Sequence, residues 1–294
     1  MNDYIIRGMS MDGFVKCVAI RSTELVRRAA EIHDTTANAT AAFGRALTAA
    51  SMMGNMQKVE NGSMTLQIRG GGPIGTITCV SDPVGNVRGC VTEPHVPLVE
   101  KYPGKLDVGA TVGVDGALTV IRDLQMKEPY IGSTELVSGE IGDDVTAYFA
   151  QSEQTPTACA LGVLVDRDQS VKVAGGYLVQ LLPGAPDDVI DTLEAGIKRS
   201  GAVTKMLEDG LTPEDILGQV MGSLGVVFLE TTEVSYKCYC TRDRVEAARI
   251  SLGKKELAEI VAEGEPFPVE CQFCDEKYIF TPQQITELLK GLEA

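Results

Sequence analysis

The sequence contains little histidine and no phosphate-binding loop. Only two histidines occur, His33 and His95, and they lie far apart in the chain. Residues 70–73 (Gly-Gly-Gly-Pro) lack the lysine and the hydroxyl that hold a nucleotide phosphate, so we interpret them as a turn. The first 230 residues offer no other active-site pattern, and we expect a protein that is not an enzyme. One alternative stays open, a dyad of a histidine with a cysteine that we expect on a half-buried strand: Cys17, Cys79, Cys90 or Cys159.

Positive charge and long apolar runs are also scarce. The chain has 26 Lys and Arg residues against 41 Asp and Glu residues, a net charge of −15 at pH 7. Because such a field repels phosphate backbones, we expect no nucleic-acid partner. The longest apolar run, residues 37–56, is interrupted by polar residues, which favours a buried helix over a membrane span. Residues 1–7 lack the basic start and apolar run of a secretory signal. We therefore expect a cytoplasmic protein with reduced thiols and no membrane partner.

Four of the eight cysteines form two close pairs near the C-terminus. Cys238 and Cys240 form a C-x-C motif, and Cys271 and Cys274 form a C-x-x-C motif 30 residues later. Two such pairs at this spacing are typical of a four-thiolate zinc site. Residues 233–236 favour a strand, so we expect both sulfurs of the first pair on one strand face. The second pair is expected in a tight turn.

Other roles for these cysteines fit the sequence less well. Core packing does not require paired cysteines, and a disulfide framework does not suit a reducing compartment. A thioredoxin-like C-x-x-C motif would open a helix, whereas residues 275–280 alternate as a strand does. Two alternatives remain: a purely structural zinc ribbon in an enzyme or transcriptional regulator, and a thiol–disulfide oxidoreductase.

Strand and helix patterns alternate irregularly, which indicates an α+β fold and not a regular βαβ repeat. Residues 22–24 are expected to start a helix, because the apolar residues after them recur at helical spacing. A second, alanine-rich helix is expected at about residues 36–56. Strands are expected at residues 64–68, 75–80, 87–91, 118–121, 161–165 and 171–182, with a hairpin turn at 166–170.

The sequence predicts three parts: an α+β core domain (1–181), a helical linker region (182–232) and a small zinc-binding domain (233–294). The linker carries two amphipathic helices, one opening at residues 186–188 and one at residues 212–215. Their glycines lower helix propensity, so docking must hold them. They form either an ordinary helical hairpin or a linker built to come loose. The last part is too small for a strong core, and we expect loss of zinc to unfold it.

Several segments carry a resemblance to a known family: residues 70–74, 85–89, 136–141, 148–156 and 174–184, together with residues 238–244 and 269–274 around the zinc motif. With them, nearly the whole chain resembles the thirty-three-kilodalton redox-regulated heat-shock chaperonins, a family of bacterial cytoplasmic holdases.

The resemblance implies an ATP-independent chaperone that binds unfolding client proteins under oxidative and heat stress. In the reduced, inactive form, Cys238, Cys240, Cys271 and Cys274 hold one zinc ion per chain. The resemblance further implies that oxidation to the disulfides Cys238–Cys240 and Cys271–Cys274 releases zinc and unfolds the domain at residues 233–294. That domain would act as the redox switch, and its unfolding would accompany formation of a homodimer. Since the C-x-C cysteines of a strand lie at the long limit for a disulfide, we expect Cys271–Cys274 to form first.

Overall fold

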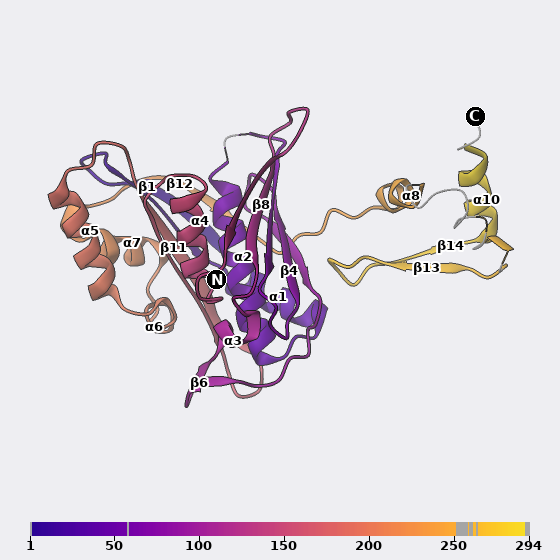
Figure 1. The fold of residues 1–294 in the computed structure, drawn as a ribbon, viewed down its shortest axis with the longest axis horizontal. Coiled ribbons are helices and arrows are strands. Elements are labelled where there is room, and N and C mark those ends of the chain that lie inside the picture. Colours follow the sequence, from indigo (N-terminus) through magenta and orange to yellow (C-terminus); the bar gives the residue numbers. More distant parts are fainter. Residues whose placement is uncertain (1, 58, 251–257, 259–260, 263, 292–294) are drawn as a thin grey trace. The chain divides into compact units, whose positions relative to one another are not determined.

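Two five-stranded antiparallel sheets form the N-terminal unit, Met1–Lys237, in the computed structural model of the chain (Figure 1). The structure describes residues 2–57, 59–250, 258, 261–262 and 264–291. A second unit, Cys238–Ala294, is described separately below. None of the helices in the described ranges is long and apolar enough to cross a membrane.

The first sheet joins strands from both ends of the unit. Its order is β10 (Thr157–Val165), β11 (Val171–Leu181), β2 (Val15–Arg21), β1 (Tyr4–Met9) and β12 (Val227–Glu233). The second sheet has the order β5 (Val87–Val91), β4 (Thr76–Ser81), β3 (Ser63–Arg69), β8 (Ala117–Asp123) and β9 (Tyr130–Glu135). A small ribbon pairs β6 (Glu100–Tyr102) with β7 (Lys105–Leu106).

Helix α2 (Ala37–Asn55) lies at the centre of the main core. Nearly all of its residues are buried, and its side chains share one apolar cluster with residues of both sheets. Its many alanines allow this close packing on more than one side. Helices α1 (Thr23–His33), α3 (Val108–Val112) and α4 (Gly142–Gln151) complete this layer.

A second apolar cluster lies on the other face of the first sheet. It joins α5 (Asp187–Ser200), α6 (Val203–Glu208) and α7 (Pro213–Met221) to strands β1, β2 and β11 (Figure 1). A short 3₁₀ turn, η1 (Gly222–Leu224), follows α7. Ile216, Leu217 and Val220 of α7 are fully buried there. The helices of the expected linker are therefore docked on the sheet.

The C-terminal unit is small. A hairpin of β13 (Phe267–Glu270) and β14 (Lys277–Phe280) is accompanied by α8 (Arg242–Ile250) and α10 (Pro282–Gly291). Phe280 and Ile285 are its fully buried apolar residues among those described. Such a core is slight for a unit of this size, which agrees with the need for a further stabilising element.

The α+β fold class is confirmed, and the expected helices and strands lie within a few residues of α1, α2, α5, α7 and strands β3, β4, β5, β8, β10 and β11. The division into a core, a linker (182–232) and a switch (233–294) stays a prediction. The structure itself separates its two units after Lys237.

Candidate metal centre

The second cysteine pair lies in the turn of the C-terminal hairpin. Cys271 directly follows β13, and two residues separate Cys274 from the start of β14. The backbone N–H of Cys274 donates to the carbonyl of Cys271 (3.2 Å), and that of Cys271 donates to the carbonyl of Glu276 (3.1 Å). These bonds close a tight knuckle in a hairpin, as expected, and not the start of a helix.

The first pair does not lie in a strand, so that expectation was wrong. Strand β12 ends at Glu233, and residues 238–240 run in an irregular segment that leads into α8. After Glu233 the chain no longer pairs with β1, and Tyr236 forms only an isolated bridge with Val87 of β5. The strand geometry that made the Cys238–Cys240 disulfide the harder one to form therefore does not apply.

The four sulfur atoms nevertheless meet at one point. All lie within 4.8 Å of one another; Cys238 Sγ is 3.7 Å from Cys271 Sγ, and Cys240 Sγ is 3.4 Å from Cys274 Sγ. Four thiolates around a tetrahedral zinc ion, at Zn–S distances of about 2.3 Å, have sulfurs about 3.8 Å apart. The four cysteines therefore fit a zinc ion and can hold a metal.

The sulfurs differ in their local electrostatics. Burial raises the pKa of Cys238 to about 11 and also raises the pKa of Cys274. Burial opposes ionisation of Cys240 too, but hydrogen bonds from the Tyr278 hydroxyl and from neighbouring cysteines lower its pKa overall. Cys240 therefore ionises more readily than Cys238 or Cys274. Metal binding would require all four as thiolates.

A set of polar contacts holds the first cysteine segment in place. Arg242 lies over the ring of Phe280, 4.5 Å from its centroid, and its Nη2 donates to the carbonyl of Ile279 and to Gln284 Oε1. Arg244 Nη1 donates to the carbonyl of Tyr239. Arg242 thus joins the chain after Cys240 to β14 and α10, and Arg244 stabilises the turn of the cysteine segment itself.

Tyr278 is a site residue that sequence reasoning missed. Its hydroxyl donates to Cys240 Sγ over 3.2 Å. A signal was present, because strand alternation puts residue 278 on the same face as Phe280, which packs in the core. Alternation gives the face but not the contact with a sulfur.

The other cysteines lie on strands, as expected: Cys17 on β2, Cys79 on β4, Cys90 on β5 and Cys159 on β10. Cys90 and Cys159 are partly buried as expected, whereas Cys17 and Cys79 are buried. Burial raises the pKa of Cys17 and of Cys159 to about 12 and that of Cys79 well above its usual range, which disfavours thiolates.

Both histidines have partners other than cysteine. His33 Nε2 hydrogen-bonds to the hydroxyl of Tyr236 (3.1 Å), and His95 Nε2 pairs with Asp34 (3.1 Å). These contacts give the histidine–cysteine dyad no support.

Comparisons with known proteins agree along almost the full length. The family model described as "Hsp33 protein" matches residues 3–281. A 33 kDa chaperonin of Agathobacter rectalis is 47% identical, over 98% of this chain and 100% of its own length. One from Bacillus cytotoxicus is 44% identical, over 99% and 100% of the two chains. The crystal structure of a 33 kDa chaperonin from Thermotoga maritima superposes with a TM-score of 0.91 at 36% identity, covering 100% of this chain and 99% of that one.

Proposed function

The chain belongs to the Hsp33 family, and from that premise we propose that it is an ATP-independent holdase chaperone switched by oxidation of four cysteines. The observation that carries the proposal is the meeting of four sulfurs, all within 4.8 Å, in the C-terminal unit. No catalysis is needed for such a function. Its reduced resting state suits a compartment such as the cytoplasm, where thiols are kept reduced.

In the resting state, Cys238, Cys240, Cys271 and Cys274 hold one zinc ion as thiolates. Zinc supplies a tetrahedral cross-link that can contribute about 10–16 kcal/mol of apparent binding free energy in small cysteine-rich folds. The described core of this unit, centred on Phe280 and Ile285, is too slight to replace it. The metal and the fold of the unit should therefore be gained and lost together.

A peroxide is the proposed oxidant. For each disulfide, two thiolates lose two electrons and form one S–S bond, while one hydrogen peroxide takes up those electrons and two protons to give two waters. Two peroxides thus oxidise all four cysteines. Sulfur in a disulfide is no longer a thiolate ligand, so the site loses its ability to hold zinc and the unit loses its cross-link.

We propose the pairs Cys238–Cys240 and Cys271–Cys274. In the folded unit the close sulfur contacts instead join Cys238 to Cys271 and Cys240 to Cys274. All four sulfurs lie within 4.8 Å of one another, however, so the pairs adjacent in sequence are also within reach, and they close the shortest loops. Peptide mapping after peroxide treatment tests this, and dominant links from Cys238 to Cys271 or from Cys240 to Cys274 would contradict it.

The proposed output of the switch is the release of α5, α6 and α7. These helices are held by their apolar contacts on the first sheet, and the chain runs from α7 through β12 to Cys238 within 17 residues (221–238). We propose that unfolding after Cys238 loosens this stretch. Undocked helices would expose side chains such as Leu193, Ile216 and Val220, which can bind the apolar surfaces of unfolding clients.

Activation is proposed to accompany homodimer formation. Strand β12 is an edge strand whose Val227, Phe228 and Leu229 are 48%, 44% and 64% exposed. Edge strands with exposed apolar side chains favour pairing between chains. This exposed edge supports the proposed dimer.

Suppression of client aggregation tests the function. Peroxide-oxidised protein should keep a thermally unfolding client in solution without ATP, and the reduced, zinc-loaded protein should do so poorly. A purely structural zinc ribbon would retain zinc under the same peroxide treatment. A thiol–disulfide oxidoreductase would instead reduce or isomerise client disulfides catalytically.

A further inference from the structure

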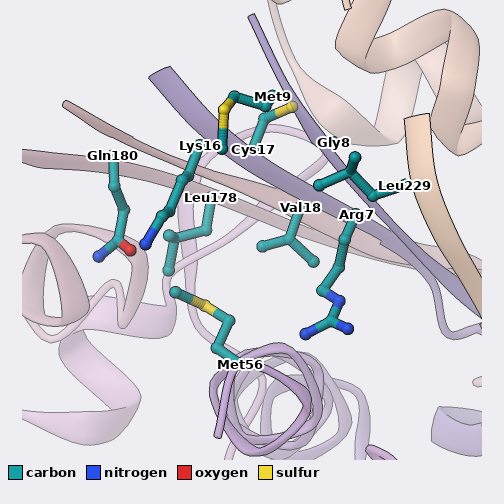
Figure 2. Close-up of a pocket in the computed structure, with 10 residues that line it drawn as sticks. All are labelled: Arg7, Gly8, Met9, Lys16, Cys17, Val18, Met56, Leu178, Gln180 and Leu229. Atoms are coloured by element: carbon teal, nitrogen blue, oxygen red, sulfur yellow. The ribbon is translucent and has the colours of Figure 1, made fainter. Parts of the chain in front are cut away.

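A pocket of about 370 Å³ opens on the inner face of the first sheet, where α2 ends (Figure 2). Its volume falls within the range of about 300–1,000 Å³ that is usual for small-molecule sites. It lies in the N-terminal unit and shares no residue with the cysteine cluster.

The strand register explains why this strip of the sheet is open. In one row across β1, β2 and β11, Arg7 lies opposite Val18, and Val18 lies opposite Leu178. Two residues along the strands, in the next row on the same face, Lys16 lies opposite Gln180. Alternation places all five side chains on the face that carries the main core. Helix α2 covers that face only as far as Asn55. The remaining two rows form the pocket.

The pocket is apolar in the middle and polar at its ends. Val18 and Leu178 form its floor, and Met56, which follows α2, lies over them (Figure 2). Thioether side chains are flexible and adapt to a variable apolar ligand. Lys16 and Gln180 point toward the same end of the pocket, and Arg7 lies on its other side (Figure 2).

The polar groups at the two ends are not equivalent. Arg7 is engaged: it forms an ion pair with Glu230 and donates to the carbonyl of Asn55 (3.2 Å). Lys16 is exposed, and no ion pair among the described residues involves it. Gln180 is only 7% exposed, and its amide nitrogen donates to Thr157 Oγ1 (3.1 Å). Since an amide nitrogen carries two N–H donors, one remains for a ligand.

We propose that this pocket binds an aliphatic carboxylate, with its head at Lys16 and Gln180 and its tail on Val18, Leu178 and Met56. The head would receive a charge-assisted hydrogen bond from the ammonium and a second bond from the amide. Around the pocket, the two positive charges of Lys16 and Arg7 exceed the one negative charge of Glu230. The site is therefore locally positive, although the chain carries a net charge of −15. This charge complementarity favours an anion.

The lining argues against other ligand classes. No residue that lines the pocket is acidic, which disfavours a divalent cation, and none is aromatic, which disfavours a stacked nucleobase or a sugar ring. The floor is aliphatic and lacks the series of backbone N–H donors that a phosphate group prefers. An unbranched tail with a single anionic head matches both parts of the site.

Calorimetric titration with decanoate, below its micellar concentration, tests the proposal on the full-length, reduced, zinc-loaded chain. One saturable site is expected. Decyltrimethylammonium, with the same tail and a cationic head, should bind at least about tenfold more weakly, the effect of losing one charge-assisted contact. Absence of decanoate binding, or equal affinity for the two amphiphiles, would overturn the proposal. The proposal would also be overturned if the protein bound an acidic, apolar peptide but not decanoate.

A charge reversal locates the head group. Lys16→Glu should weaken decanoate binding at least about tenfold. Lys127→Glu is the matched control, because Lys127 is exposed between β8 and β9 and the change in net charge is the same. Unaltered affinity in Lys16→Glu, or an equal loss in both variants, would show that the site is elsewhere.

Methionine methyl resonances locate the tail. Decanoate should shift the methyl resonance of Met56. The resonance of Met221, which is buried in the cluster on the opposite face of the sheet, should not change. A shift at Met221 with none at Met56 would contradict the assignment. Both readouts are independent of oxidation and of client binding.

Discussion

The hydroxyl of Tyr278 donates a hydrogen bond to the sulfur of Cys240 over 3.2 Å. The two residues come from opposite ends of the C-terminal unit, from β14 and from the segment before α8. A hydrogen bond to a thiolate withdraws electron density from the sulfur, so it stabilises the charged form and weakens it as a nucleophile. When zinc already holds Cys240 as a thiolate, only the loss of nucleophilicity matters, so Tyr278 is placed to slow the attack of Cys240 on an oxidant.

Removing this hydroxyl should accelerate the switch. In Tyr278→Phe, peroxide should release zinc about two- to tenfold faster, the kinetic equivalent of one ordinary hydrogen bond. Release is followed with a colorimetric chelator under a fixed excess of peroxide. Tyr102→Phe, at an exposed position on β6, is the control and should behave as the wild type. Equal rates of zinc release in all three proteins would show that Tyr278 does not slow the oxidation of Cys240.

Replacing a single ligand should abolish the metal site. In Cys271→Ser and in Cys274→Ser, zinc content after anaerobic purification should fall well below one equivalent, because serine is a poor zinc ligand. Limited proteolysis should then cleave beyond about residue 230 more readily than in the wild type. Cys90→Ser, on β5 and outside the cluster, should keep its zinc. Full zinc retention in both ligand variants would rule out a four-thiolate site.

Two glycines in the docked helices predict opposite effects. A Cβ at Gly196 of α5 would lie 2.0 Å from the carbonyl oxygen of Val220 in α7, whereas a Cβ at Gly218 of α7 would meet nothing within 4 Å. Gly196→Ala should force α5 from α7 and raise holdase activity in the reduced state. Gly218→Ala should gain about 1 kcal/mol of helix propensity and leave the reduced protein inactive.

Aggregation assays on both reduced variants compare these effects, and circular dichroism checks that each protein remains folded. If Gly196→Ala measurably loosens α5 and yet stays inactive until it is oxidised, undocking is not the step that activates the chaperone.

Asp3 predicts a pH dependence of stability. Burial raises the pKa of this carboxyl to about 6, and the hydrogen bond from the Leu25 N–H offsets only part of that effect. In the unfolded chain the pKa is about 3.9. The native state therefore binds the proton more tightly, so this residue's contribution lowers the free energy of unfolding as pH rises from about 4 to 6.

In Asp3→Asn this contribution should vanish, while the amide oxygen still accepts from Leu25. Urea titrations at several pH values give the difference in unfolding free energy between variant and wild type. That difference should move in favour of the variant by about 1–3 kcal/mol across the window. A difference that is constant over this range would show that Asp3 titrates normally.

Strong local patterns made much of the fold predictable. The run of small residues in α2 and the alternation in β3, β4 and β5 indicated their structure directly. The capping box of α7 was equally clear: Thr212 Oγ1 accepts from the N–H of Asp215, and the Asp215 carboxylate accepts from that of Thr212. Each of these signals depends on a few neighbouring residues.

Features that depend on distant partners were missed. Strand β12 has no alternation because it is an exposed edge, and its pairing with β1 joins residues more than 200 positions apart. The same long-range pairing ends at Glu233, which is why the C-x-C motif is not in a strand. Likewise, the sequence favoured four converging cysteines, but the Tyr278 contact required the turn geometry that brings β14 to Cys240.

The measurement that tests the central claim most directly is hydrogen–deuterium exchange in α5, α6 and α7 before and after oxidation. Peptides covering residues 187–221 should be protected in the reduced, zinc-loaded protein and lose protection once peroxide has oxidised the four cysteines. Peptides from α2, which is almost entirely buried, should stay protected in both states. If residues 187–221 remain protected in oxidised protein that suppresses client aggregation, release of these helices is not how the switch produces chaperone activity.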